Sequence, residues 1–337
     1  MSFSAKTHRH LWSRRDVLRD ALALVAVGFG LPAWSVAATS DLAGVTLHVA
    51  DIKGADEGFF AAAGVGDTPY RLQPVRLSQA SLASEALNAR AYDLSFESNI
   101  ASLFLPGRTP VRLAGFVGFR PEAFKVYVRP GRGIGQMSQI RGRRIAYMRG
   151  GPLHLFLLEI LRHEGLTLSD IQPVALSALD SAAAYQSGDI DVVLAGMFAP
   201  SYQIEQAGAH LLATGADFPA FAQNNGMSVA TYDEELTDPL KREAIKDYLQ
   251  RLVKTWHWLD QHEDIWSKEM ATLFGVPPEF IIRHRPRLAD TRILSSAVGR
   301  ERTQHVAQVF VAGGAIPGVP LMNRLWDPVL ESLLPAI

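Results

Sequence analysis

The sequence predicts an α/β protein with about two domains, and three observations lead to this fold class. Strand-like and helix-like runs alternate from residue 45 to residue 231, as they do in α/β proteins. The 337 residues suffice for about two domains, each with its own core. Residues 143–166 read as a buried strand, a glycine turn and a helix, which is the repeating unit of such a sheet.

The strand–turn–helix unit also suggests a place for an anion. The strand covers residues 143–148, Pro152 suits the first helical position, and Gly165 can end the helix in the left-handed conformation. Gly150 and Gly151 leave backbone N–H groups at the positive end of the helix dipole, where anions bind. The alternative is an ordinary connection whose glycines serve only the turn.

The remaining elements follow from apolar periodicity and turn residues. Strands are predicted at 45–50, 70–77, 92–96, 111–117, 124–129, 172–176, 191–196, 210–213 and 227–231. Helices are predicted at 56–63, 82–90, 178–186, 201–207, 265–274, 278–284 and 295–312, with shorter helical turns up to residue 104 and at 138–141. Pro74 marks an edge strand, because proline offers no N–H to a neighbour. Apolar residues spaced by four and three from Ile245 to Leu259 predict one more amphipathic helix.

The first forty residues predict export. Five basic residues precede the apolar run Ala21–Leu31, and Ser35–Ala38 offers small residues for cleavage, so residues 1–38 form a signal peptide whose apolar run is too short to span a membrane. Ser13–Arg19 resembles the twin-arginine consensus for the export of folded proteins. The alternative is a general secretory signal that happens to contain paired arginines.

Charge and cysteine content narrow the class of protein. The net charge is −1, and removal of residues 1–38 takes five of 33 basic and two of 34 acidic residues and leaves −4, which argues against a nucleic-acid partner. The chain has no cysteine, which excludes disulfides, a thiolate nucleophile, a cysteine metal site and a lipid-anchoring cysteine. We therefore expect a soluble, unanchored protein of a bacterial periplasm.

Four segments are similar to those of one known family: Leu82–Asp93, Ile140–Ala146, Ser169–Val174 and Tyr185–Asp191. Their order and spacing resemble the periplasmic substrate-binding proteins of bacterial ABC transporters for sulfonates, taurine and nitrate, and the match covers essentially the whole mature chain. The resemblance implies the type II periplasmic binding protein fold. In that fold two α/β lobes, each a mixed sheet flanked by helices, are joined by two crossovers and close over a ligand.

The resemblance also implies how the chain is divided and what it does. Lobe 1 would hold residues 41–125 and 230–337, lobe 2 would hold 126–229, and the crossovers would be Phe124–Arg129 and Met227–Thr231. The implied function is to bind a small organic anion, a sulfonate or a carboxylate, as a monomer and deliver it to an ABC permease in the inner membrane. No catalytic residue, metal or cofactor is implied.

Six loops correspond by position to the family's ligand site. They contain Asp51, Lys53 and Gly54; Glu97, Ser98 and Asn99; Phe119 and Arg120; Arg149, Gly150, Gly151, Pro152 and His154; Met197 and Phe198; and Asn224 and Asn225. Arg120 and Arg149 can clamp an acid group bidentately, Lys53 adds a point charge, and His154 can donate a hydrogen bond. The alternative for each is a solvated or packed side chain without contact to a ligand.

Departures from the family pattern suggest an unusual ligand. Gly151 and Pro152 stand where relatives carry hydroxyl residues, and Gly196-Met197-Phe198 replaces a Trp-Asp-Pro-like segment. Glu97 adds a negative charge. Our hypothesis is a ligand with a larger body, such as an aromatic one.

Two other functions stay open at this point. Sulfinate desulfinases of similar fold need a cysteine, which is absent, whereas aromatic-acid decarboxylases share a segment like 92–95. A ligand-sensing subunit of a receptor is the other alternative. His257 and His262 are five apart and lie on different helix faces, so they do not suggest a metal site. No nucleophile elbow or P-loop motif occurs.

Overall fold

The computed structural model describes residues 42–77, 82–105, 110–196, 199–284 and 293–335. The predicted signal peptide (residues 1–38) and the predicted site residues Met197 and Phe198 lie outside these ranges. Within them, none of the helices combines the length and the apolar character needed to cross a bilayer.

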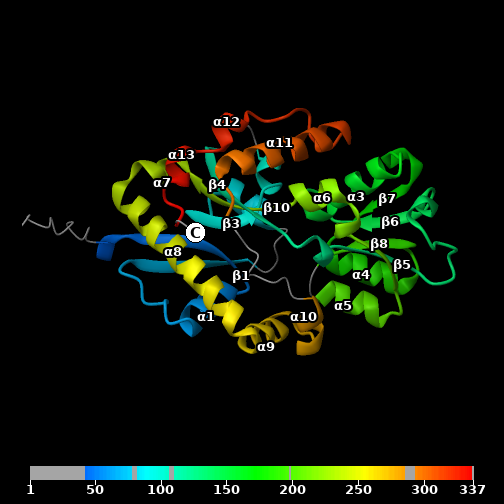
Figure 1. The fold of residues 1–337 in the computed structure, drawn as a ribbon, viewed down its shortest axis with the longest axis horizontal. Helices are drawn as coiled ribbons and strands as arrows, with labels where there is room; N and C mark the ends of the chain where they lie inside the picture. The colour runs from blue at the N-terminus through cyan, green and yellow to red at the C-terminus, as the bar shows by residue number, and fades with distance from the viewer. Residues whose placement is uncertain (1–41, 78–81, 106–109, 197–198, 285–292, 336–337) are drawn as a thin grey trace, which may run out of the picture. The chain divides into compact units, whose positions relative to one another are not determined.

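The first of two sheets contains β1 (Thr46–Ile52), β2 (Arg71–Leu77), β3 (Leu94–Ser98), β4 (Val111–Gly118) and β10 (Gly226–Tyr232), in the order β2-β1-β3-β10-β4 (Figure 1). β1 runs parallel to β2 and β3, whereas β10 is antiparallel to β3 and β4. β2 is an edge strand, as Pro74 predicted.

The second sheet contains β5 (Lys125–Val128), β6 (Arg144–Tyr147), β7 (Gln172–Ala175), β8 (Val192–Ala195) and β9 (His210–Thr214), in the order β7-β6-β8-β5-β9. β6 is parallel to β7 and β8, and β5 is antiparallel to β8 and β9. The carboxyl ends of β6 and β8 and the first residue of β5 therefore lie at the same end of the sheet.

Helices flank both sheets. Their bounds are α1 Ala55–Ala62, α2 Ala83–Asn88, α3 Pro152–His163, α4 Ala178–Ser187, α5 Ala199–Gln206, α6 Pro219–Asn224, α7 Asp233–Thr237, α8 Pro239–Gln261, α9 Glu263–Phe274, α10 Pro278–His284, α11 Ser296–Ala312, α12 Met322–Leu325 and α13 Pro328–Glu331, and the 3-10 turns include η3 Ala101–Phe104 and η5 Met137–Ile140. Pro152 begins α3 and Gly165 follows it with φ of 65°, as predicted. Helices α6, α7, α12 and α13 were not predicted, because at four to six residues they are too short to show an apolar period.

The chain passes between the sheets at places other than those expected. β5 and β10, which coincide with the expected crossovers Phe124–Arg129 and Met227–Thr231, are each paired along their length within one sheet. The connections are instead residues 119–124 and 215–225, which lie outside the strands. The expectation was wrong because β-rich runs of this kind satisfy their backbone groups best inside a sheet.

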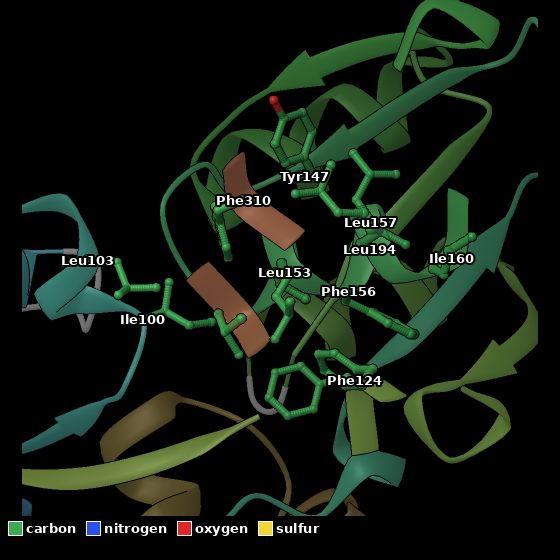
Figure 2. Close-up of a cluster of buried hydrophobic side chains, with 14 of the residues drawn as sticks. Ile100, Leu103, Phe124, Tyr147, Leu153, Phe156, Leu157, Ile160, Leu194 and Phe310 are labelled. Atoms are coloured by element: carbon green, nitrogen blue, oxygen red, sulfur yellow. The ribbon is translucent and has the colours of Figure 1, made fainter. Parts of the chain in front are cut away.

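Helix α11 connects the two sheets through a shared core. It packs on β4 and on α3. Buried side chains from the first sheet, such as Val111 and Leu113, belong to the same hydrophobic cluster as Val126 and Ile145 from the second. Figure 2 shows part of this cluster, with Ile100 and Leu103 near one end.

Candidate functional site

The glycine turn before α3 has the predicted backbone conformation, but its backbone N–H groups are not all free to bind an anion. Gly150 is left-handed (φ 77°), and Gly151 caps the helix in an extended conformation. However, the Gly150 N–H donates to Nδ1 of His154 at 3.3 Å. One N–H of the expected anion cradle is therefore already bonded within the turn.

His154 serves this turn as a neutral ring. It is 2% exposed, and burial, together with the nearby Arg149 charge, lowers its pKa to about 4. Because Nδ1 accepts from Gly150, the ring proton lies on Nε2. If His154 donates a hydrogen bond to a ligand, as the sequence suggests, it can do so only from Nε2.

Aromatic rings support the turn from three elements. The His154 ring lies 5.0 Å from that of Tyr147 in β6 and 4.9 Å from that of Phe310 in α11. Phe310 in turn meets Phe104 of η3 edge-on at 5.3 Å. Arg149 stands beside them, exposed, and its side chain forms no hydrogen bond or ion pair with any residue that the structure describes.

Three of the predicted loops meet at the start of β10. Asn99 Nδ2 donates to the Asn224 carbonyl at 3.3 Å, and the Asn99 N–H donates to the Gly226 carbonyl at 3.1 Å. The Phe119 N–H donates to the Asn225 carbonyl at 3.1 Å. Loops 97–99, 119–120 and 224–225 are therefore joined by hydrogen bonds, and Arg120 lies half-buried in the second of them.

Several buried polar atoms in this region have no hydrogen-bond partner among the described residues. They are Glu97 Oε2, Asn99 Oδ1, Ser228 Oγ and both polar side-chain atoms of Asn225. Ser228 lies directly opposite Glu97 in the β3–β10 register. Each unpaired buried group costs about 1–3 kcal/mol, so such a concentration is typical of a site that serves something other than stability.

Glu97, which was expected to add a negative charge, is a buried and hydrogen-bonded carboxyl group. Its Oε1 accepts from Ser95 Oγ at 2.5 Å and from the Tyr92 hydroxyl at 3.1 Å. Burial nevertheless raises the pKa of this 8% exposed carboxyl to about 7, because those two hydrogen bonds offset only part of the desolvation. Near neutral pH the group is therefore about half protonated.

The loop after β1 has structural partners of its own. Asp51 accepts the N–H groups of Asp56 and Glu57 at 3.1 and 3.3 Å and so begins α1, with Gly54 left-handed (φ 83°) between them. Lys53 Nζ donates to the Leu273 carbonyl at 3.1 Å, at the end of α9.

Sequence reasoning missed side chains that act across long distances in the chain. Thr303 Oγ1 accepts from Asn99 Nδ2 at 3.2 Å, and Arg302 beside it lies 4.8 Å from the centre of the Phe116 ring, where burial lowers its pKa. Both residues are on α11. The sequence of this helix shows only an amphipathic pattern, which does not indicate their partners in other elements.

Comparison of the sequence with known proteins identifies its family. The sequence model described as NMT1/THI5 like matches residues 46–262, more than half of the chain. The chain belongs to this family. The prediction from the four similar segments is confirmed, since a protein of Escherichia coli K12 described as an aliphatic sulfonates-binding protein is 25% identical over 263 residues, which are 72% of this chain and 76% of that protein.

Solved structures confirm the predicted two-lobed binding-protein fold. The alkanesulfonate-binding protein SsuA of Xanthomonas axonopodis pv. citri, bound to MOPS, has a TM-score of 0.68 at 23% identity, with 83% of this chain and 98% of that one covered. A mutant form of DszB in complex with biphenyl-2-sulfinic acid has a TM-score of 0.60 at 15% identity, with 86% and 98% covered. At these identities the likeness establishes the fold alone.

Proposed function

We propose that this protein is the periplasmic substrate-binding component of an ABC importer, and that it binds a small organic anion between its two lobes, one built on each sheet, for delivery to the permease. The observation on which this rests is the meeting of loops 97–99, 119–120 and 224–225 around buried, unpaired polar atoms. Ligands of α/β sheets bind outside strand ends of this kind.

The side chains at these ends favour an anion. Arg149 is exposed, without a described partner, and follows the carboxyl end of β6, so its guanidinium is available for a bidentate contact with a carboxylate or sulfonate. Arg120 supplies a second cation at the connection between the sheets. The related SsuA protein was solved with MOPS, itself an organic sulfonate.

The residues in and behind the glycine turn favour an organic ligand over a small inorganic ion. Gly151 and Pro152 offer no hydroxyl, and the rings of Tyr147, Phe104 and Phe310 lie close behind the turn. We therefore propose an aromatic or extended aliphatic acid rather than taurine or nitrate.

The cellular setting is part of the same proposal. The basic start, the short apolar run and the twin-arginine-like Ser13–Arg19 support export, and the absence of cysteine leaves no lipid attachment site. We expect a monomer in the periplasm.

Ligand capture is the test of this function. Mass spectrometry of the protein purified from its native source should release an organic acid. In a thermal-shift panel, a cognate anion at 100 times its Kd should stabilise the fold by about 2.7 kcal/mol, whereas taurine and nitrate should not. The function would be wrong if no sulfonate or carboxylate raised the melting temperature.

One observation favours an enzyme as the second candidate, namely the shared fold with DszB. Conversion of a bound aromatic carboxylate, followed by chromatography over several hours, would decide for it. Release of the unchanged ligand on denaturation would decide for the binding protein.

A further inference from the structure

A buried polar cluster outside the predicted loops joins three elements. Lys125 is the first residue of β5, Tyr127 follows it on the same face, Glu205 lies on α5 and His284 ends α10. Lys125 is only 8% exposed, and the side chains of Glu205 and His284 are 23% and 10% exposed. None of these residues has a role in the site described above.

The hydrogen bonds of the cluster fix the state of each group. Oε1 of Glu205 accepts from the Tyr127 hydroxyl at 2.5 Å and lies 3.3 Å from His284 Nε2. Lys125 Nζ lies 3.4 Å from the same oxygen and 3.1 Å from His284 Nδ1. Since an ammonium can only donate, His284 accepts at Nδ1 and donates from Nε2 as a neutral ring, in agreement with its pKa, which burial first and then the Lys125 charge lower to about 4.

This arrangement leaves Lys125 with a spare donor. An ammonium has three N–H groups, and two are directed to Glu205 and His284. Arg283, the exposed neighbour of His284, adds a second positive charge near the cluster and lowers the pKa of His284 further. With His284 neutral, two cations therefore face one carboxylate.

Lys125 lies at the end of the second sheet where the anion is expected to bind, next to the carboxyl ends of β6 and β8. Lys125 pairs with Ala195, the last residue of β8, and Ala146 of β6 pairs with Val193 of β8. The Arg149 turn and Lys125 thus lie at the same end of the sheet, on strands that are two positions apart. Their backbones are therefore separated by about 10 Å. Tyr127, on the same face as Lys125, packs with residues of α4 and α5, whereas Tyr147 packs with residues of α3. A ligand that contacts both Lys125 and Arg149 would therefore lie above the end of the sheet.

We propose that Lys125, which His284 holds in place and whose charge Glu205 partly neutralises, is a third cationic contact for the acid group of the ligand, besides Arg149 and Arg120. This inference rests on the proposed function and adds to it a residue of β5. Because α10 supplies His284, the contact would be complete only while α10 stays packed against α5, as the rings of Phe280 and Tyr202 (5.1 Å) place it here.

The test compares four proteins in calorimetric titrations with octanesulfonate, benzenesulfonate and benzoate. Lys125→Met should weaken binding of the best probe at least tenfold, and Lys246→Met, at an exposed lysine of α8, should leave it unchanged. Glu205→Gln should tighten binding about threefold or more, because it removes the carboxylate that the cluster holds. A cluster that merely docked α10 would show no tightening.

A measurement without substitutions keeps the inference falsifiable if Lys125→Met does not fold. In the unaltered protein, saturating probe should slow reductive methylation of Lys125 severalfold and leave that of Lys246 unchanged. If the unaltered protein binds a probe but Lys125→Met binds it within twofold, or Lys125 is not protected, the inference is wrong and the function stands. If the unaltered protein binds none of the probes, both are wrong.

Discussion

Glu97 gives the sharpest test of the electrostatics at the proposed site. Its pKa is raised from 4.5 to about 7, so the folded protein holds this proton more tightly than the unfolded chain does. The stability that protonated Glu97 contributes is fully present below pH 4.5 and is lost as pH rises through 7. A shift of this size corresponds to about 3 kcal/mol, at about 1.36 kcal/mol per pKa unit.

Glu97→Gln isolates this contribution, because the amide has nearly the shape of the protonated acid and does not titrate. At pH 5 the variant should be more stable than the parent by less than about 1 kcal/mol. At pH 8 the variant should be more stable by up to about 3 kcal/mol, because it no longer buries a charge. Urea denaturation at the two pH values measures both differences.

Glu243→Gln is the matched control, since Glu243 is exposed on α8. Its unfolding free energy relative to the parent should not change between pH 5 and pH 8. A stability difference for Glu97→Gln that was equal at both pH values would refute the reasoning, because it would mean that Glu97 is ionised in the folded protein at pH 5.

Three further predictions concern the site and its support. Arg149→Ala should weaken anion binding by roughly 10- to 150-fold, the value of one charge-assisted hydrogen bond of about 1.5–3 kcal/mol, as calorimetry would show; unchanged affinity would exclude a contact. Gly226→Ala should lower the melting temperature, because its Cβ would lie 2.3 Å from Phe116 Cζ, whereas Gly118→Ala on the paired strand meets nothing within 4 Å and should be neutral. Phe310→Ala should cost about 3–5 kcal/mol in urea denaturation, and a loss below 1 kcal/mol would contradict its place in the core.

The fold was predictable because its signals are local. Pro74 marked the edge strand, and Pro152 and Gly165 marked the ends of α3, each through the conformation of its own backbone. The crossovers were misplaced because a β-rich run does not reveal which neighbour it will pair with. That depends on the whole sheet.

The meeting of three of the predicted loops agrees with the sequence, but the hydrogen-bond partners of their side chains could not be predicted from it. The sequence identified the loops of Asn99 and Asn225, which the structure brings together. It did not show that His154 would accept from Gly150, or that Lys53 would bind the end of α9. Those outcomes depend on burial and on partners up to 220 residues away, which no local pattern encodes.

The position of α11 has a consequence for how a ligand could enter. The helix is seated on β4 near Gly299, while its later turns meet α3, where His305 Nε2 lies 3.0 Å from Glu159 Oε1 and Phe310 is fully buried. Separating the two sheets would expose Phe310, which costs about 1.5–3 kcal/mol. This contribution alone would limit the separated form to at most roughly one molecule in ten to one in two hundred. The association rate of the ligand would then be set by this small population, and shortening the side chain at position 310 would speed entry even as it weakens the fold.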